Sequence, residues 1–322
     1  MDSKSDQGHE QQAKPDLASA LSESDTTSSS TSTSATQTPE SSPEQHVVKP
    51  VVAKISPDCP KIVLPQLPRR KGRSWLFRFE EGVLMKESYD TRTSECAAMQ
   101  YVHQHAPSVP VPKVHHSDFT DPRKGLIFME EIPGETLENV WPSLDPIQKE
   151  LACRDLWDII MALRQIPRPE GIPPEKCLYT TVDGSPLYPQ GGLTGNEVAP
   201  LREDQYNTDD AFRNFIIQRY RENHGPSDEV KSNFPRSETA VFTHGDIKPR
   251  NVMAAVDGRI TSLLDFEYAG FMPDYWEDLG MFMEIWEWEK DWADMMMRTK
   301  PSSWDFEAPR ALCRVAKRVL HF

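Results

Sequence analysis

The fold is decided by the stretch His244-Gly245-Asp246-Ile247-Lys248-Pro249-Arg250-Asn251, which follows a short apolar strand predicted at 240–243. Asp246 lies in the polar loop after that strand, where a carboxylate can align or accept the proton of a hydroxyl group. Asn251 stands at the start of the next predicted strand. The pattern indicates a catalytic loop.

A predicted hairpin follows this loop. Its strands are 252–256 and 260–264, and Asp257-Gly258-Arg259 is a strong turn signal between them. Because the second strand folds back on the first, we expect Asn251 and Asp265 to lie side by side. A single aspartate is also typical of a turn or a strand end, but the complete string favours a site.

Phosphoryl transfer requires a group that orients the attacking hydroxyl, oxygen ligands for Mg²⁺ and cations against the phosphates. We assign Asp246 as the catalytic group. Asn251 and Asp265 carry the oxygen atoms that Mg²⁺ prefers. Lys86 ends a predicted strand and Glu95 lies in the first turn of the next helix. They form either a surface ion pair of little value or a lysine held against phosphates.

The remaining elements form a sheet-rich part and then a helical part. The first part is predicted to contain strands at 75–79 and 83–86, a helix capped by Thr93 or Ser94, and a hairpin of 111–119 with 126–129. The second is predicted to contain a helix starting at Asp145-Pro146, a helix at 209–222, a helix at 275–289 and an irregular connection at 168–207. In the first of these helices, the face expected to be buried contains Ile147, Leu151, Ile159 and Leu163.

From Trp75 to Trp288 the chain resembles the aminoglycoside phosphotransferase and choline kinase group, relatives of the protein kinases, and it resembles fungal members most. The motifs are the loop at 244–251 and the segment 264–270, which is similar to the family's metal-binding segment. The resemblance implies an α+β, protein-kinase-like two-lobed fold, with a small antiparallel-sheet N-lobe and a larger, mainly helical C-lobe. It also implies the cofactors ATP and Mg²⁺.

The resemblance implies further roles. Lys86 and Glu95 fit the nucleotide-binding lysine and its helix partner. Lys248 takes the place of a phosphate-contacting lysine, and Glu130 lies in the interlobe hinge whose backbone contacts adenine. No Gly-rich loop precedes Lys86, and only Gly72 stands close upstream of the two predicted strands that lead to it. This departure predicts a short nucleotide lid or an impaired site.

Composition limits the partners. The net charge is −14, which disfavours nucleic acid. No apolar run is long enough for a membrane span, and no secretory signal begins the chain, so we expect a cytoplasmic monomer or weak dimer. Five scattered cysteines predict neither disulfides nor zinc.

The expected divisions are a disordered Ser/Thr-rich tail at 1–60, the N-lobe at 61–133 and the C-lobe at 134–322.

We predict an enzyme that moves the γ-phosphate of ATP to a hydroxyl of a small molecule, such as an aminoglycoside, a choline-like alcohol or another metabolite. Gly245 favours this activity over that of a protein kinase. A catalytically weak or inactive nucleotide-binding or scaffold protein is the alternative. The carboxylates Glu267, Asp274 and Glu277 either face the substrate or accept structural hydrogen bonds.

Overall fold

The computed structural model describes residues 62–63, 74–88, 91–121, 124–175, 177–188, 200–201, 203–283, 285–304 and 311–314. The predicted disordered tail and Gly72 lie outside these residues. Within them, no helix has both the length and the apolar character that a membrane span requires.

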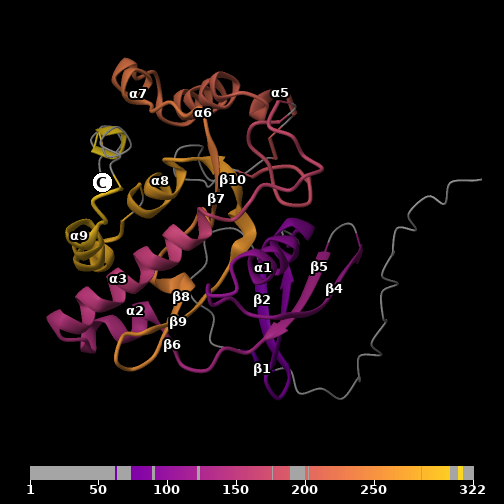
Figure 1. Ribbon diagram of the computed structural model, residues 1–322, viewed down its shortest axis with the longest axis vertical. Coiled ribbons are helices and arrows are strands. Elements are labelled where there is room, and N and C mark those ends of the chain that lie inside the picture. The colour runs from indigo at the N-terminus through magenta and orange to yellow at the C-terminus, as the bar shows by residue number, and fades with distance from the viewer. Residues whose placement is uncertain are drawn as a thin grey trace, which may run out of the picture. The chain divides into compact units, whose positions relative to one another are not determined.

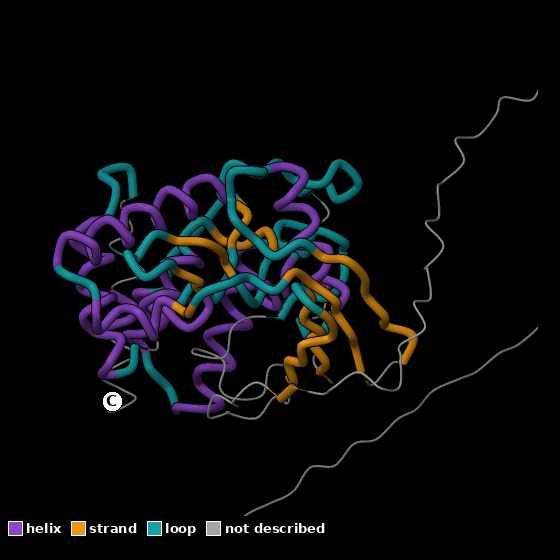
Figure 2. Tube along the Cα trace, turned by 90° about the horizontal axis from the view of Figure 1, so that it is seen from below, coloured by secondary structure: helices purple, strands orange, loops and turns teal. Residues whose placement is uncertain are grey.

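The first part of the described chain is a five-stranded antiparallel sheet with the strand order β1-β2-β3-β5-β4. Its elements are β1 (Ile62–Val63), β2 (Ser74–Glu80), β3 (Val83–Ser88), β4 (Val114–Asp121), β5 (Lys124–Glu130) and the helix α1 (Thr93–His105). Figure 1 labels β1, β2, β4 and β5 of this sheet near α1, and Figure 2 draws the strands in orange. The predicted cap of α1 was wrong. The cap residue is Arg92, which makes no side-chain cap bond, because the Thr93 hydroxyl donates to the Asp183 carboxylate instead (2.9 Å).

The second part is mainly helical. Its helices are α2 (Leu137–Val140), α3 (Pro146–Leu163), α5 (Glu203–Tyr206), α6 (Asp209–His224), α7 (Asp228–Asn233), α8 (Trp276–Phe282) and α9 (Lys290–Thr299), and its 3₁₀ turns are η1 (Trp141–Ser143), η2 (Pro249–Asn251), η3 (Phe266–Tyr268) and η4 (Glu287–Glu289). Two small sheets pair β10 (Gly270–Pro273) with β7 (Ala240–Thr243), and β6 (Glu135–Thr136) with β8 (Val252–Ala254) and β9 (Ile260–Leu263). The predicted α+β kinase-like class is confirmed, while the lobe boundary after residue 133 stays a prediction.

Helix α3 begins as predicted but buries a different face. Asp145 accepts hydrogen bonds from two backbone amides and forms a capping box with Gln148. Ile147 and Leu151 are 71% and 55% exposed, so their predicted burial was wrong. The face that includes Trp157 is buried because α9 packs on it, and there the Trp157 indole donates to the Met296 carbonyl (2.9 Å).

The predicted single helix at 275–289 was also wrong. The segment contains the short helix α8, then the turn η4, and α9 follows. The Glu289 carboxylate turns back to accept a hydrogen bond from the Trp286 amide (2.9 Å). This capping bond starts a new helical turn at a point where the sequence pattern predicts continuity.

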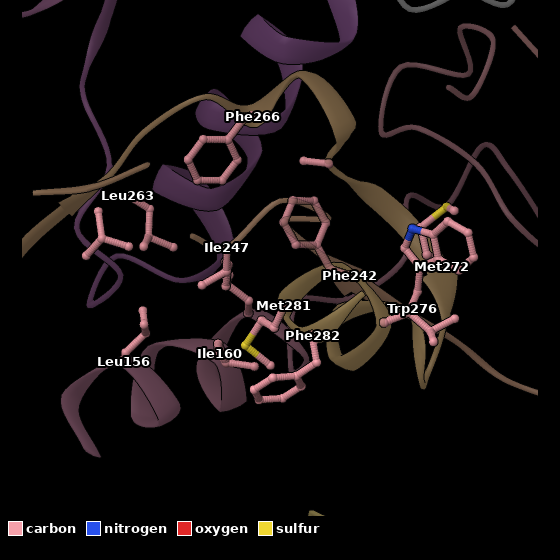
Figure 3. Close-up of a cluster of buried hydrophobic side chains, with 14 of the residues drawn as sticks. Leu156, Ile160, Phe242, Ile247, Leu263, Phe266, Met272, Trp276, Met281 and Phe282 are labelled. Atoms are coloured by element: carbon pink, nitrogen blue, oxygen red, sulfur yellow. The ribbon is translucent and has the colours of Figure 1, made fainter. Parts of the chain in front are cut away.

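A hydrophobic cluster lies under the predicted catalytic loop. Figure 3 shows Ile247, from the loop itself, close to Ile160 of α3 and Met281 of α8. Ile247 is fully buried, and burying a side chain of this size stabilises the fold by about 1.5–3 kcal/mol. The side chain that follows Asp246 therefore fixes the loop to the core.

Candidate functional site

The β8–β9 hairpin brings Asn251 and Asp265 together, as predicted. Val252 pairs with Leu263 across the hairpin, and the Leu264 amide donates to the Asn251 carbonyl (2.8 Å). The next residue along the chain is Asp265. Gly258 closes the turn with φ +89°, and its amide donates to the Ala255 carbonyl (2.9 Å).

Asp246 is held by neighbours in its own loop. The Asn251 Nδ2 atom donates to Asp246 Oδ2 (2.8 Å) and to the Asp246 carbonyl (2.9 Å). This orientation leaves Asn251 Oδ1 as the free acceptor end of the amide, since no described residue donates to it. One turn thus presents a carboxylate and an amide oxygen together.

Lys86 of β3 contacts both the next helix, α1, and a segment that lies far along the chain. Its Nζ atom lies 2.7 Å from Glu95 Oε1 and 2.7 Å from Asp265 Oδ1. Lys86 and Glu95 are buried, whereas the Asp265 side chain is 36% exposed. Burial disfavours the charged ammonium, but the two carboxylates outweigh it and raise the Lys86 pKa. Burial alone would raise the pKa of Asp265, but the positive charge of Lys86 has the larger effect. The pKa of Asp265 is therefore lowered.

Asp265 has an unusual backbone conformation. Its φ of 67° and ψ of 66° are left-handed, and it is the only non-glycine residue with a positive φ in the described parts of the chain. Such a conformation costs about 1–2 kcal/mol for most residues and less for Asp and Asn. The backbone turns here directly into η3, and the carboxylate is directed to Lys86.

Glu277 of α8 fixes the start of the predicted catalytic loop. Its two carboxylate oxygens accept hydrogen bonds from the His244 amide (2.7 Å) and the Gly245 amide (3.1 Å). Burial raises the pKa of Glu277 to about 7, although the two amides oppose the shift. Of the two interpretations that the sequence left open, the structural hydrogen-bond acceptor is the one this geometry supports.

Gly245 has a steric reason to be glycine. Its φ is +84°, and a Cβ atom would lie 2.8 Å from the Tyr268 carbonyl oxygen.

His244, which precedes Gly245, is fully buried. Since the Asp246 amide donates to His244 Nδ1 (3.2 Å), the other ring nitrogen, Nε2, carries the proton and donates to the Leu264 carbonyl (2.9 Å). Burial lowers the pKa of His244, which favours this neutral form.

Two of the predicted nucleotide contacts do not join this cluster. Lys248 is buried, and its Nζ atom donates to the Met281 carbonyl (2.9 Å). This position does not fit the predicted phosphate contact, because the ammonium group would first have to leave the core. Glu130 ends β5 with its amide donating to the Lys113 carbonyl (2.9 Å), and its place in the adenine-contacting hinge stays a prediction.

The donor set suits Mg²⁺ bound with a phosphate. Among the described residues no group of three or more His, Cys, Asp or Glu side chains could hold a metal alone. Mg²⁺ usually keeps several waters and takes one or two carboxylates plus substrate phosphates. The partly exposed Asp265 carboxylate and the Asn251 amide oxygen match that requirement.

The comparisons with known proteins agree with this geometry. The model of the phosphotransferase enzyme family matches residues 67–312. The chain belongs to this family. A comparison with curated proteins finds no significant match.

The fold of this phosphotransferase family member is similar to two solved structures. One is aminoglycoside phosphotransferase APH(4)-Ia, with a TM-score of 0.50 and 15% identity over 79% of this chain and 83% of that chain. The other is the GDP and kanamycin complex of APH(2")-IIia, with a TM-score of 0.50 and 12% identity over 83% and 87% of the two chains. At such identities the likeness shows the fold alone.

Sequence reasoning missed two charged residues of the candidate site. The Arg250 guanidinium lies 3.0 Å from Asp246 Oδ2 and 3.5 Å from Glu289 Oε1. Arg250 stood within the quoted motif, but its partner Glu289 comes from η4, far along the chain. A salt bridge between such distant positions leaves no local signal in the sequence.

Proposed function

We propose that this chain is a Mg-ATP-dependent phosphotransferase that moves the γ-phosphate to a hydroxyl of a small molecule. The observation that supports this most is the position of Lys86, whose ammonium group contacts both Glu95 and Asp265 at 2.7 Å. That contact brings the sheet-borne lysine beside the hairpin that carries Asn251. Family membership and a neighbour solved with GDP and kanamycin agree with the proposal.

Each residue then has one role. Lys86, held by Glu95, neutralises nucleotide phosphate charge. Asp265 and Asn251 hold Mg²⁺, which, when bound, offsets the negative charge of the phosphates. Asp246 orients the acceptor hydroxyl and takes its proton as the acceptor oxygen bonds to the γ-phosphorus. The bond from phosphorus to the bridging oxygen breaks, and ADP leaves with that electron pair.

We propose a hydroxyl-bearing small molecule as the class of substrate. The place of Asp246 beside Asn251 supports a hydroxyl acceptor, whose proton the carboxylate would take. We propose a small molecule because Gly245 and the family match point away from peptide substrates. Half-buried Glu267, whose pKa burial and Asp265 raise to about 8, lies next to the proposed metal ligand and remains a candidate contact.

A thermal-shift experiment tests the nucleotide site. Mg-ATP should raise the melting temperature of the wild-type chain, and Asp265→Asn should remove most of that rise because one metal ligand is lost. The matched control is Asp294→Asn, which removes a carboxylate from the exposed surface of α9. No Mg-dependent rise in the wild type would contradict the proposal.

Transfer is then measured against a panel of hydroxyl-bearing compounds, with phosphorylation of the acceptor detected by mass spectrometry. Asp246→Asn should lower the rate by about 10²–10⁴-fold, the usual contribution of a general base. Turnover that Asp246→Asn leaves unchanged would disprove the role of this carboxylate while leaving the nucleotide site intact.

A further inference from the structure

The Arg250 guanidinium binds the Asp246 carboxylate, which is the group that takes the hydroxyl proton in the proposed reaction. Its Nη2 atom lies 3.2 Å from Asp246 Oδ1 and 3.0 Å from Asp246 Oδ2. The Asn251 amide takes another position on Oδ2. In this arrangement a hydroxyl or a water that approached Asp246 would compete with a charge-assisted contact, which is stronger than a neutral hydrogen bond.

A second carboxylate is placed to receive the same guanidinium. Glu289 is fully buried, and its Oε2 atom is fixed by the Trp286 amide (2.9 Å). Its Oε1 atom is also buried and accepts no hydrogen bond from any described residue. The Arg250 Nη1 atom is 3.5 Å away from it, which is too far for a good hydrogen bond.

An unsatisfied buried carboxylate oxygen is costly. A small movement of Arg250 toward Glu289 would satisfy that oxygen and would uncover Asp246. The Arg250 side chain is 34% exposed, so it has space to move. The two carboxylates thus provide two resting positions for one guanidinium group.

We propose that Arg250 shields Asp246 from water until the acceptor binds and moves to Glu289 Oε1 when the acceptor hydroxyl takes its place. The inference rests on the proposed function. Without the shield, water attacks instead: its oxygen bonds to the γ-phosphorus, its proton passes to Asp246, and the bond to the bridging oxygen breaks to release ADP. Arg250 thereby favours transfer to the acceptor over hydrolysis of ATP.

The test measures phosphate release from Mg-ATP by the full-length chain without an acceptor. Arg250→Met should raise this rate by about tenfold, which is less than the 10²–10⁴-fold that a fully effective general base supplies. Arg250→Lys keeps one cation beside Asp246 and should raise the rate less than Arg250→Met. The control is Arg154→Met, which breaks an exposed ion pair with Glu150 on α3 and should change nothing.

Two double variants make the result specific. Arg250→Met leaves the buried Glu289 charge uncompensated, so Arg250→Met with Glu289→Gln tests the same prediction in a chain without that charge, and it should hydrolyse ATP as fast as Arg250→Met. Arg250→Met with Asp246→Asn should fall below the wild-type rate. Glu289→Gln alone should not exceed the wild-type rate, because Arg250 then stays on Asp246.

The outcomes separate this inference from the proposed function. Absence of a Mg-ATP thermal shift in the wild type overturns both. A retained shift with no increase in hydrolysis in either Arg250→Met chain overturns the shield alone. An increase that persists with Asp246→Asn also overturns it, since the water would then be activated elsewhere.

Discussion

Replacing Gly245 with alanine tests whether backbone geometry determines the catalytic loop. Gly245 has φ +84°, and the added Cβ would lie 2.8 Å from the Tyr268 carbonyl oxygen and 3.1 Å from the Tyr268 Cβ. Backbone atoms cannot rotate away as a side-chain tip can. The loop or η3 must therefore shift, and both carry residues of the proposed site.

Two contributions determine how much Gly245→Ala should lower the free energy of unfolding. A left-handed conformation costs an alanine about 1–2 kcal/mol. Forcing an extra methyl group into packed surroundings typically adds about 1–3 kcal/mol. Gly82 is the matched control, because its φ is +75° but nothing lies within 4 Å of its Cβ position. Gly245→Ala should thus destabilise the protein by roughly 2 kcal/mol more than Gly82→Ala.

The assay is urea denaturation, with the free energy of unfolding extrapolated to water. Activity is measured in parallel on the folded fraction. Gly245→Ala should lose activity because Asp246 moves with the loop, whereas Gly82→Ala should retain it if the β2–β3 turn has no catalytic role. Equal destabilisation by the two substitutions would refute the argument, since the steric contact with Tyr268 would then contribute nothing.

Three further predictions concern the supports of the site. Ile247→Ala should destabilise the protein by about 2–5 kcal/mol, while Ile147→Ala, at a position 71% exposed, should cost little in the same urea titration. Lys86→Met should abolish the Mg-ATP thermal shift and, by leaving the buried Glu95 charge unpaired, destabilise the fold by about 3–5 kcal/mol; adding Glu95→Gln should restore stability but not nucleotide binding. Burial raises the pKa of Glu277 to about 7 from an ordinary 4.5, so the folded chain holds this proton more tightly than the unfolded chain, and stability is lost as the pH rises from 4.5 through 7. Glu277→Gln should flatten that fall in stability, measured as melting temperature against pH.

The sequence alone was sufficient to predict features that depend on interactions between residues close together in the chain. The turn at Asp257-Gly258 folds β9 back on β8, and the pairing, after a register shift between Met253 and Ala254, places Asn251 opposite Leu264 and next to Asp265. The cap at Asp145 was equally local, because its partners are the next few amides. These features need no knowledge of the remote parts of the chain.

The sequence alone was insufficient to predict contacts that depend on a partner far away in the chain. Ile147 and Leu151 fit the buried helical face in pattern, but α9 packs on the face of Trp157 instead. Lys248 is buried against α8 and does not fit the predicted phosphate contact, because its ammonium group donates a hydrogen bond to the Met281 carbonyl. Similarly, the contact of Arg250 with Glu289 depends on where η4 begins.

The left-handed backbone at Asp265 has an evolutionary consequence. Asparagine tolerates this conformation better than most residues, and its codons differ from those of aspartate by a single base. One point mutation can therefore remove the carboxylate beside Lys86 while the chain keeps its backbone. Lineages that carry this protein have a short path from a phosphotransferase to a folded, catalytically silent relative, whereas alanine or valine at the same position would be selected against for stability as well.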